Sequence, residues 1–281
     1  MFRIGCHLSS SKGFLAMAKQ AEEIGANTFQ FFTRNPRGGK AKDLDVKDIA
    51  AYQQYAAEHG IGQILAHAPY TINACGKDER VQEFARETMA DDLRRLEEIP
   101  DCKYNFHPGS HVQQGAEVGI EKIAGVLNEI MWQEQKTTVL LETMAGKGTE
   151  VGRNFEELAR IYDGVVHNDK LRVCFDTCHV NDSGYDLVND LSGTLEQFDK
   201  VIGKNQIAVF HINDSKNTCG ASKDRHENIG FGNIGFDTLK EIVYLKEFDR
   251  NFLKMPGIIH YGRYVDDMLL VVDRTVKNDE T

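Results

Sequence analysis

The chain has 281 residues, of which 41% are hydrophobic and 27% are charged, and its formal net charge is −10. This composition is ordinary for a soluble globular protein with a sizeable core. No apolar stretch approaches the roughly 20 residues that span a bilayer, and the start at Met1 has no signal-peptide layout, so we expect a cytoplasmic protein without a membrane partner. The six cysteines form no CxxC pair, so we expect no disulfides.

The acidic net charge argues against a nucleic-acid binder, because phosphate contacts are normally made by an excess of Lys and Arg. The objection is weakened if the chain binds metal dications, because these would be the largest local charges at such a site. An acidic protein can therefore still present one positive cleft to a phosphate.

Strand-type runs alternate with helix-type runs of period near 3.6 along the whole chain. The predicted strands cover residues 3–8, 28–32, 63–67, 104–107, 138–142, 172–176, 207–211 and 257–260. The predicted helices cover residues 13–24, 46–59, 80–98, 117–133, 154–162, 193–202, 236–247 and 264–276.

Eight strand–helix units in about 250 to 280 residues have the size and order of an α/β (β/α)8 TIM barrel, in which the active site lies at the C-terminal rim of the strands. A doubly wound open sheet is the alternative, and it would place a ligand at one switch point fed by few strands. Here the third to seventh strands all end in candidate ligands, which favours the closed barrel. With no linker or low-complexity run, we expect one domain over residues 1–281.

Eight residues that could hold metal lie at or near the downstream ends of these strands. They are His67, His107, Glu142, Asp176, His179, His211, Asp224 and His226. A lone residue of this kind usually satisfies a backbone group, but the recurrence points to a shared site. Imidazole and carboxylate together suit zinc or another borderline divalent ion, and eight such residues have room for more than one ion.

Two local patterns support this interpretation. Glu142 ends the apolar run Thr-Val-Leu-Leu, where a carboxylate without a partner would be costly to bury, and no arginine is close in sequence. Asp224 and His226 are two apart, so in an extended loop both can reach one metal ion. The alternative for this second pair is that it only hydrogen-bonds the loop.

Several long motifs, in the same order, resemble the endonuclease IV family, the zinc-dependent apurinic/apyrimidinic endonucleases of base-excision repair. The matching segments are GCHLS at 5–9, FFTRNPR at 31–37, HAPY at 67–70, FHPGSH at 106–111, LETMAGKG at 141–148, FDTCH at 175–179, HINDSK at 211–216 and DRHENIG at 224–230. A resemblance by chance at so many motifs, over nearly the whole chain, has a very low probability.

The resemblance implies a TIM barrel that holds three zinc ions per chain. It implies these ligand sets: His67, His107 and Glu142; the bridging Glu142 with Asp176 and His211; and His179, Asp224 and His226. The implied reaction is hydrolysis of the phosphodiester 5′ to an abasic site in double-stranded DNA, leaving a 3′-hydroxyl and a 5′-deoxyribose phosphate. Glu142 would serve as the bridging ligand for a metal-activated hydroxide, so no Ser, Cys or Lys nucleophile is needed. Removal of blocked 3′ ends and a monomeric state are also expected.

The same resemblance suggests which side chains contact DNA. Arg37 and Tyr70 match positions on loops that enter the duplex near the lesion, and Asn35 lies beside Arg37. Their alternative roles are those of exposed or rim-packed side chains. We expect His7 and His111 to lie behind the ligands, orienting one of them or contacting phosphate.

The chain departs from the family pattern at the eighth predicted strand, where the family has an apolar strand ending in Glu-Thr-Pro. His260 stands at the place of that glutamate, and neither threonine nor proline follows. Either His260 replaces the glutamate as a zinc ligand, or the second zinc binds poorly and the chain is a DNA-lesion binder with impaired catalysis. A third alternative is a divalent-metal sugar isomerase on a related barrel. Five of the eight candidate ligands are histidines, which favours zinc and the endonuclease.

Overall fold

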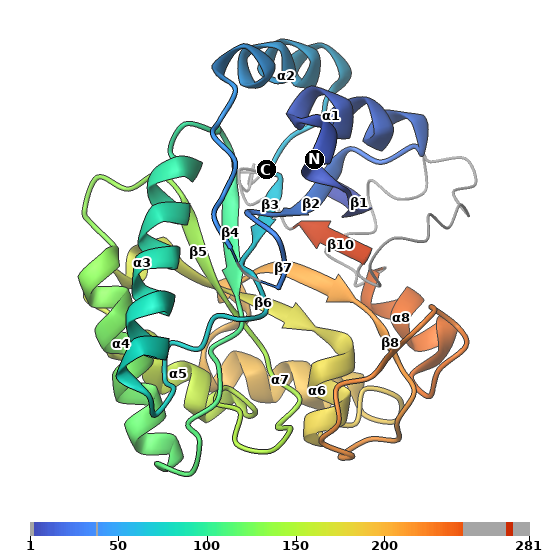
Figure 1. Ribbon diagram of the computed structural model, residues 1–281. Helices are drawn as coiled ribbons and strands as arrows, with labels where there is room; N and C mark the ends of the chain where they lie inside the picture. Colours follow the sequence, from blue (N-terminus) through green and yellow to red (C-terminus); the bar gives the residue numbers. More distant parts are fainter. Residues whose placement is uncertain (1–2, 38, 244–267, 272–281) are drawn as a thin grey trace, which may run out of the picture.

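Eight strands close into a barrel in the part of the chain that the computed structural model describes, residues 3–37, 39–243 and 268–271 (Figure 1). They are β1 (Arg3–His7), β2 (Thr28–Phe32), β3 (Leu65–His67), β4 (Lys103–Phe106), β5 (Thr138–Glu142), β6 (Leu171–Asp176), β7 (Ile207–Ile212) and β10 (Met268–Val271). Their order around the barrel is β1-β10-β7-β6-β5-β4-β3-β2. The closed barrel confirms the predicted TIM-barrel fold and excludes the open sheet.

The last strand differs from its prediction. β1 to β7 pair in parallel wherever two of them are neighbours, whereas β10 runs antiparallel to both β1 and β7. The prediction of a helix over residues 264–276 is therefore wrong at Met268–Val271. These residues form the unbroken apolar run Met-Leu-Leu-Val, and periodicity alone does not separate a buried strand from a helix in so short a run. The strand predicted at 257–260 lies outside the described residues, so the one-domain prediction for 1–281 stays a prediction.

Eight helices lie in the described residues, and most of them cover the outside of the barrel. They are α1 (Phe14–Glu23), α2 (Val46–His59), α3 (Glu79–Leu96), α4 (Ala116–Ile130), α5 (Phe155–Asp163), α6 (Thr177–Ser183), α7 (Leu191–Val201) and α8 (Gly235–Val243), with 3-10 turns at Ser10–Lys12, Asn168–Lys170 and Lys204–Gln206. Side chains cap several of the starts, as Asp45 does for α2, Asp78 for α3 and Asn154 for α5. None of the described helices has the length and apolarity that crossing a membrane requires.

Two short pieces were not predicted, and both border the barrel rim. One is α6, which begins directly after β6. The other is the hairpin of β8 (Asp214–Ser215) and β9 (His226–Glu227), which pair antiparallel. Seven residues and two residues per strand are too few for a periodic signal.

The strand period of two explains why the candidate ligands gather at one end of the barrel. A cluster of buried residues drawn only from strands (Leu65, Leu140, Cys174, Ala208, Val209 and Leu269) fills the inside of the barrel. In four strands the next inward position downstream holds a candidate ligand, giving the pairs Leu65 and His67, Leu140 and Glu142, Cys174 and Asp176, and Val209 and His211. The ligands therefore form the polar layer above an apolar plug.

Candidate metal centre

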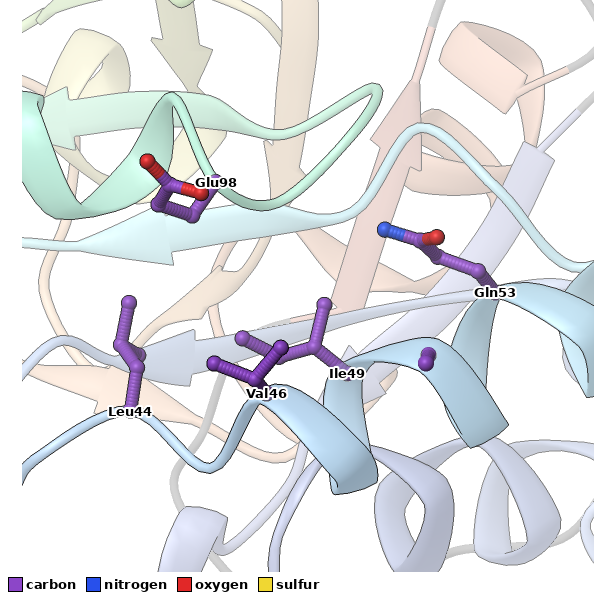
Figure 2. Close-up of a pocket in the computed structure, with 6 residues that line it drawn as sticks. Leu44, Val46, Ile49, Gln53 and Glu98 are labelled. Atoms are coloured by element: carbon purple, nitrogen blue, oxygen red, sulfur yellow. The ribbon is translucent and has the colours of Figure 1, made fainter.

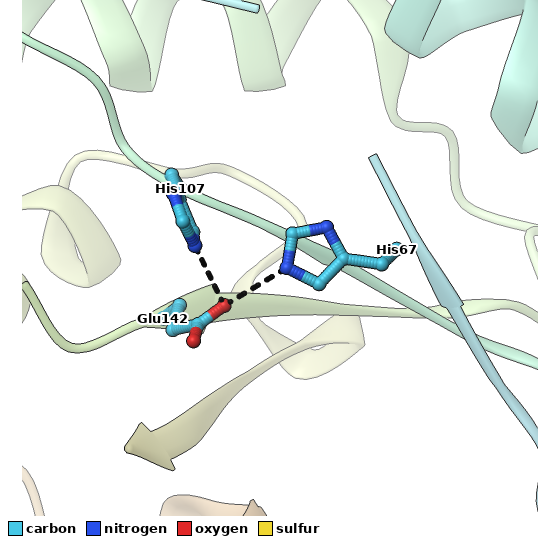
Figure 3. Close-up of side chains that lie close together, drawn as sticks. All are labelled: His67, His107 and Glu142. Carbon is cyan, nitrogen blue, oxygen red and sulfur yellow. Dashed lines mark ion pairs between the residues drawn. The ribbon is translucent and has the colours of Figure 1, made fainter. Parts of the chain in front are cut away.

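Glu142 lies at the centre of the rim cluster, with one carboxylate oxygen between two histidines. Its Oε2 lies 3.3 Å from Nε2 of His67 and 3.3 Å from Nε2 of His107 (Figure 3). His67 ends β3, His107 directly follows β4 and Glu142 ends β5, so three neighbouring strands present these atoms. The structure brings these three predicted residues together, in an arrangement that would suit one metal ion.

The other carboxylate oxygen of Glu142 faces a different set. Oε1 lies 2.9 Å from Nδ1 of His211, and the same nitrogen lies 3.8 Å from Oδ2 of Asp176. The side chains of these residues are at most 2% exposed. Its two carboxylate oxygens therefore face two different ligand sets, and Glu142 could contribute an oxygen to a metal ion in each.

A third set lies beside α6 and the β8–β9 hairpin. Oδ1 of Asp224 lies 3.2 Å from Nε2 of His179 and 3.4 Å from Nε2 of His226. His179 also forms a group with Asp176 and His226, in which one possible ligand atom of each residue lies within 4.8 Å of the other two. The pair Asp224 and His226 therefore does more than hydrogen-bond its own loop, and its atoms converge with those of His179.

Backbone carbonyls fix how two of the histidine rings are turned. Nδ1 of His67 lies 2.6 Å from the carbonyl oxygen of Ala68, and Nδ1 of His179 lies 2.8 Å from that of Thr143. A carbonyl oxygen only accepts, so each Nδ1 carries the proton and each Nε2 is left to face the carboxylates. A ring held in this way offers Nε2 to a metal ion.

The buried charges shift the pKa values of the cluster in opposite directions. Burial alone would raise the pKa of Glu142, but the histidines His211 and His107 outweigh it and hold that pKa well below its usual range. Burial alone would lower the pKa values of His107 and His179. Glu142 instead raises the pKa of His107, and Asp176 and Asp224 raise the pKa of His179 well above its usual value. The carboxylates thus favour positive charge between them, as a proton or as a metal ion.

Two cysteines lie close enough to join these groups, Cys174 beside Glu142 and His211, and Cys178 beside Asp224 and His226. Burial raises the pKa of Cys174 to about 12 and that of Cys178 further still, so both are neutral thiols at pH 7 while no metal is bound. Cys174 also packs within the apolar plug of the barrel. The donor set offered by charged groups is therefore nitrogen and oxygen, which fits zinc.

Residues that the sequence analysis missed support the ligands from behind. Nδ2 of Asn105 donates to Oε2 of Glu142 at 2.5 Å, and Nδ2 of Asn213 donates to Oδ2 of Asp176 at 2.7 Å. Asn105 lies two residues before His107, and Asn213 lies two residues after His211. The strand period that places a ligand inward also places its neighbour two residues away, and that signal could have found both asparagines.

The three predicted DNA-contacting residues lie on two loops that touch each other. The backbone N–H of Tyr70 donates to the carbonyl oxygen of Pro36 at 3.0 Å, and Oδ1 of Asn35 accepts from the backbone N–H of Arg37. Asn35 and Arg37 are exposed, and Tyr70 is 54% exposed while its ring lies 5.7 Å from that of His67 and 5.9 Å from that of His107. The tyrosine therefore covers the first ligand set from the solvent side.

The predicted supporting histidines take different places. His7 contacts the buried amide of Gln30, which in turn contacts the ligand candidate His211. Nδ1 of His111 accepts from the backbone N–H of Gly115, a contact within its own loop. His260 lies outside the described residues.

A surface pocket of about 260 Å³ lies away from this rim, against the outer helix α2 (Figure 2). It is lined by Leu44, Val46, Ile49, Ala50, Gln53 and Glu98. With no histidine and one carboxylate, this lining lacks the donor set of a metal site, which the rim cluster has.

Comparison with known proteins assigns the family. A family described as xylose isomerase-like TIM barrel matches residues 18–253. A protein named "Probable endonuclease 4" from Clostridium botulinum (strain Alaska E43 / Type E3) is 60% identical over 86% of this chain and 88% of its own length. Another of that name from Alkaliphilus oremlandii (strain OhILAs) is 56% identical over 86% of each chain. The chain belongs to the endonuclease IV family.

Solved structures agree with this membership. Endonuclease IV from Thermus thermophilus has a TM-score of 0.77 and 30% sequence identity, covering 87% of this chain and 88% of its own. A D-tagatose 3-epimerase-like protein has a TM-score of 0.63 at 19% identity, which is a likeness of fold alone. For this member of the endonuclease IV family, the match to the family description ends at residue 253, ahead of the segment that holds His260.

Proposed function

We propose that the protein is a DNA-repair endonuclease that hydrolyses the phosphodiester on the 5′ side of abasic sites in double-stranded DNA, with three zinc ions. The observation that carries the proposal is the position of Glu142, whose Oε2 faces His67 and His107 while its Oε1 faces His211. A single bridging carboxylate between two ligand sets, with a third set adjacent, suits a multi-metal phosphodiesterase. The high identity to curated endonuclease 4 relatives supports the same activity.

The donor sets fit zinc, and the residues that would hold it are those of the three sets described above. Bound there, zinc lowers the pKa of water towards neutrality and offsets negative charge on a phosphate. The chain's own task is to keep each donor atom in place. Asn105 holds the bridging carboxylate, Asn213 holds Asp176, and the carbonyls of Ala68 and Thr143 turn their histidine rings.

Substrate binding falls to the two connected loops at the same rim. Arg37 is exposed and offers a guanidinium for a DNA phosphate, and Tyr70 presents an exposed ring beside the first ligand set. An aromatic side chain at this place can stack where a base is missing, because an abasic nucleotide has little stacking energy to lose when it leaves the helix. We assign both residues, with Asn35 as the side chain that shapes their loop, to DNA binding.

The second ligand set has three described members, Glu142, Asp176 and His211. We retain His260 as the candidate fourth ligand because imidazole is a competent zinc donor and this residue replaces the family glutamate in the sequence. An imidazole in place of a carboxylate supplies one negative charge fewer. We therefore expect the zinc ion of the second ligand set to be the most weakly bound of the three.

The experiment is to purify the full chain without chelators, measure zinc per chain by elemental analysis, and assay the same sample on a duplex with one abasic analogue. About three zinc ions with 5′-side nicking, and no nicking of an intact duplex, is the expected result. Binding of the abasic duplex without nicking would overturn the proposal in favour of an impaired lesion binder. Conversion of a ketose or aldose without nicking would instead restore the isomerase alternative, for which the epimerase structures supply fold similarity alone.

A further inference from the structure

Gln30 joins two histidines inside the barrel. It lies on β2, and its side chain is completely buried. Its Oε1 lies 2.7 Å from Nε2 of His211, and its Nε2 lies 3.0 Å from Nδ1 of His7. In the barrel order β2-β1-β10-β7, this amide reaches past two strands to meet β7.

The two ends of an amide have fixed roles, because the oxygen only accepts and the nitrogen donates. The oxygen of Gln30 therefore requires a proton on Nε2 of His211. A neutral imidazole with its proton on Nε2 has its lone pair on Nδ1. Nδ1 is the nitrogen of His211 that faces Glu142 at 2.9 Å and Asp176 at 3.8 Å.

His211 is turned the opposite way from two other candidate ligands, His67 and His179. His67 and His179 donate through Nδ1 to backbone carbonyls and present Nε2. The ring of His211 presents Nδ1, so its Nε2 points into the barrel, where strand carbonyls are directed along the wall at neighbouring strands. A side-chain acceptor is needed there, and Gln30 supplies it.

We propose that Gln30 is a positioning residue that fixes the tautomer and orientation of His211, so that Nδ1 serves as the ligand atom for a divalent metal ion of the zinc type in the second ligand set. This inference rests on the proposed function for the identity of the ion and deepens it at one site. The same amide fixes the ring of His7, since its N–H group donates to Nδ1 of His7 and leaves the proton of that ring on Nε2. A support of this kind typically changes metal affinity by about 10- to 100-fold.

Two substitutions that keep the approximate volume of Gln30 distinguish the role of its side-chain oxygen from the role of its size. Gln30→Leu removes the acceptor, and Gln30→Glu keeps an acceptor opposite His211. Zinc binding is measured for each variant in a series of buffers of fixed free zinc. We expect Gln30→Leu to bind one of its zinc ions about 10- to 100-fold more weakly than the wild type while the others are unchanged. Gln30→Glu should bind all of them with wild-type affinity or better.

A spectroscopic signature tests the tautomer itself. In zinc-loaded wild-type protein, long-range proton–nitrogen NMR should show a His211 ring with a slowly exchanging Nε2–H. Gln30→Glu should retain this signal, and Gln30→Leu should lose its protection from exchange. Thermal melting with a chelator checks that the variants fold, and Gln30→Met replaces Gln30→Leu if the branched side chain does not pack.

The outcomes separate this inference from the proposed function. Equal zinc affinity and an unchanged His211 signal in Gln30→Leu or Gln30→Met would overturn the role of Gln30, whether or not the wild type cuts abasic DNA. Selective weakening of one zinc ion supports that role even if the wild type fails to nick, in which case the proposed function alone is wrong. A wild-type chain that binds no zinc would overturn both.

Discussion

The carboxylate of Asp182 accepts a hydrogen bond from the backbone N–H of Asp224 at 3.1 Å, across 42 residues of sequence. Asp182 lies on α6, three residues after His179, and is completely buried. Its side chain also accepts from Oγ of Ser215 and Nδ2 of Asn217, and its carbonyl accepts from the backbone of Ser222. Asp182 thus connects the loop that holds Asp224 and His226 to helix α6, which holds His179.

Replacing Asp182 with alanine should release that loop. Asp224 has a positive φ of 52°, a conformation that is uncommon for residues other than glycine, and its backbone N–H is held by Asp182. We expect Asp182→Ala to weaken the binding of one zinc ion by about 10- to 100-fold and to leave the affinity for the other two unchanged. Metal analysis at buffered free zinc measures this, with Asp186→Ala as a control because the side chain of Asp186 accepts hydrogen bonds from its near neighbours Val188 and Asn189. Retention of all three ions at wild-type affinity would contradict the bracing role.

Removing the bridging charge should reduce catalysis by orders of magnitude, with a much smaller effect on folding. Glu142→Gln keeps the shape of the side chain but cannot bridge two cations as an anion, and His107→Ala removes one donor of the first set. For each we expect a loss of nicking of several orders of magnitude, because ligands of one metal cluster act as a unit. Single-turnover nicking of an abasic duplex measures the loss. The exposed Glu117→Gln is a matched control on α4, and near-wild-type nicking by Glu142→Gln would refute the bridging assignment.

The metal-free protein should be most stable at mildly acidic pH. The pKa values of His107 and His179 are raised above their ordinary value of 6.5, so their stabilisation is complete below that pH and is lost as pH rises through the raised values. The pKa values of Glu142 and Asp224 are lowered from 4.5 and 3.8, so their stabilisation is present above those values and is lost as pH falls through the lowered ones.

This sign pattern places the maximum melting temperature of the chelator-treated protein between the ordinary carboxyl value of 4.5 and the ordinary histidine value of 6.5. Melting curves from pH 4 to 9, with and without zinc, test it. The difference between the two curves should grow with pH, because zinc competes with protons for the histidines. A metal-free melting temperature that rises steadily from pH 6 to 8 would be inconsistent with the shifts.

Arg37 should act on DNA through charge alone. If its guanidinium contacts one phosphate, Arg37→Ala should weaken binding to every duplex and reduce the slope of log affinity against log salt by about 1. Binding of a labelled abasic duplex to catalytically inactive Glu142→Gln protein, at several salt concentrations, measures the slope. Arg160→Ala is the control, because Arg160 on α5 pairs with Glu117 on the outer face of the barrel. An unchanged slope would remove Arg37 from the interface.

Asp214 should contribute more to stability than to chemistry. Its buried carboxylate accepts from the backbone N–H groups of Gly230, Gly232, Ile234 and Gly235. At Gly232 a Cβ would lie 2.4 Å from Oδ1 of Asp214, so the loop closes this tightly only on glycine. Asp214→Ala leaves several backbone donors without an acceptor, at a cost of about 1 to 3 kcal/mol each. We expect the free energy of unfolding, measured with urea, to fall by at least about 3 kcal/mol. Asp199→Ala removes one exposed hydrogen bond from the backbone N–H of Lys204 and should change stability far less.

The sequence predicted most of the barrel because its signals are local. β2, β5 and α2 have the predicted bounds, and α2 shows its cap at Asp45 and its left-handed Gly60 in the sequence itself. The eight candidate ligands were found because strand ends recur along the chain and because the family motifs surround them. Their convergence then followed from the parallel order of the strands.

Other features of the site depend on contacts that no local pattern contains. Gln30 and His211 lie 181 residues apart, and Asp182 and Asp224 lie 42 apart. A glutamine in a strand or an aspartate in a short helix has many ordinary roles, and its partner is set only by closure of the barrel. The antiparallel course of β10 was missed for the same reason, since its direction is decided by the edges of β1 and β7 rather than by its own four residues.

The reversed direction of β10 decides from which side this part of the chain can supply a ligand. Met268, its first residue, is paired with Ile212 and Cys6 at the metal rim, while Val271, its last, is paired with Val209 and Arg3 towards the opposite mouth of the barrel. In a parallel eighth strand, the donor would arrive at the end of the strand, as in the Glu-Thr-Pro pattern. Here the polarity is inverted, so β10 meets the metal rim with its first residue, Met268, and not with its last.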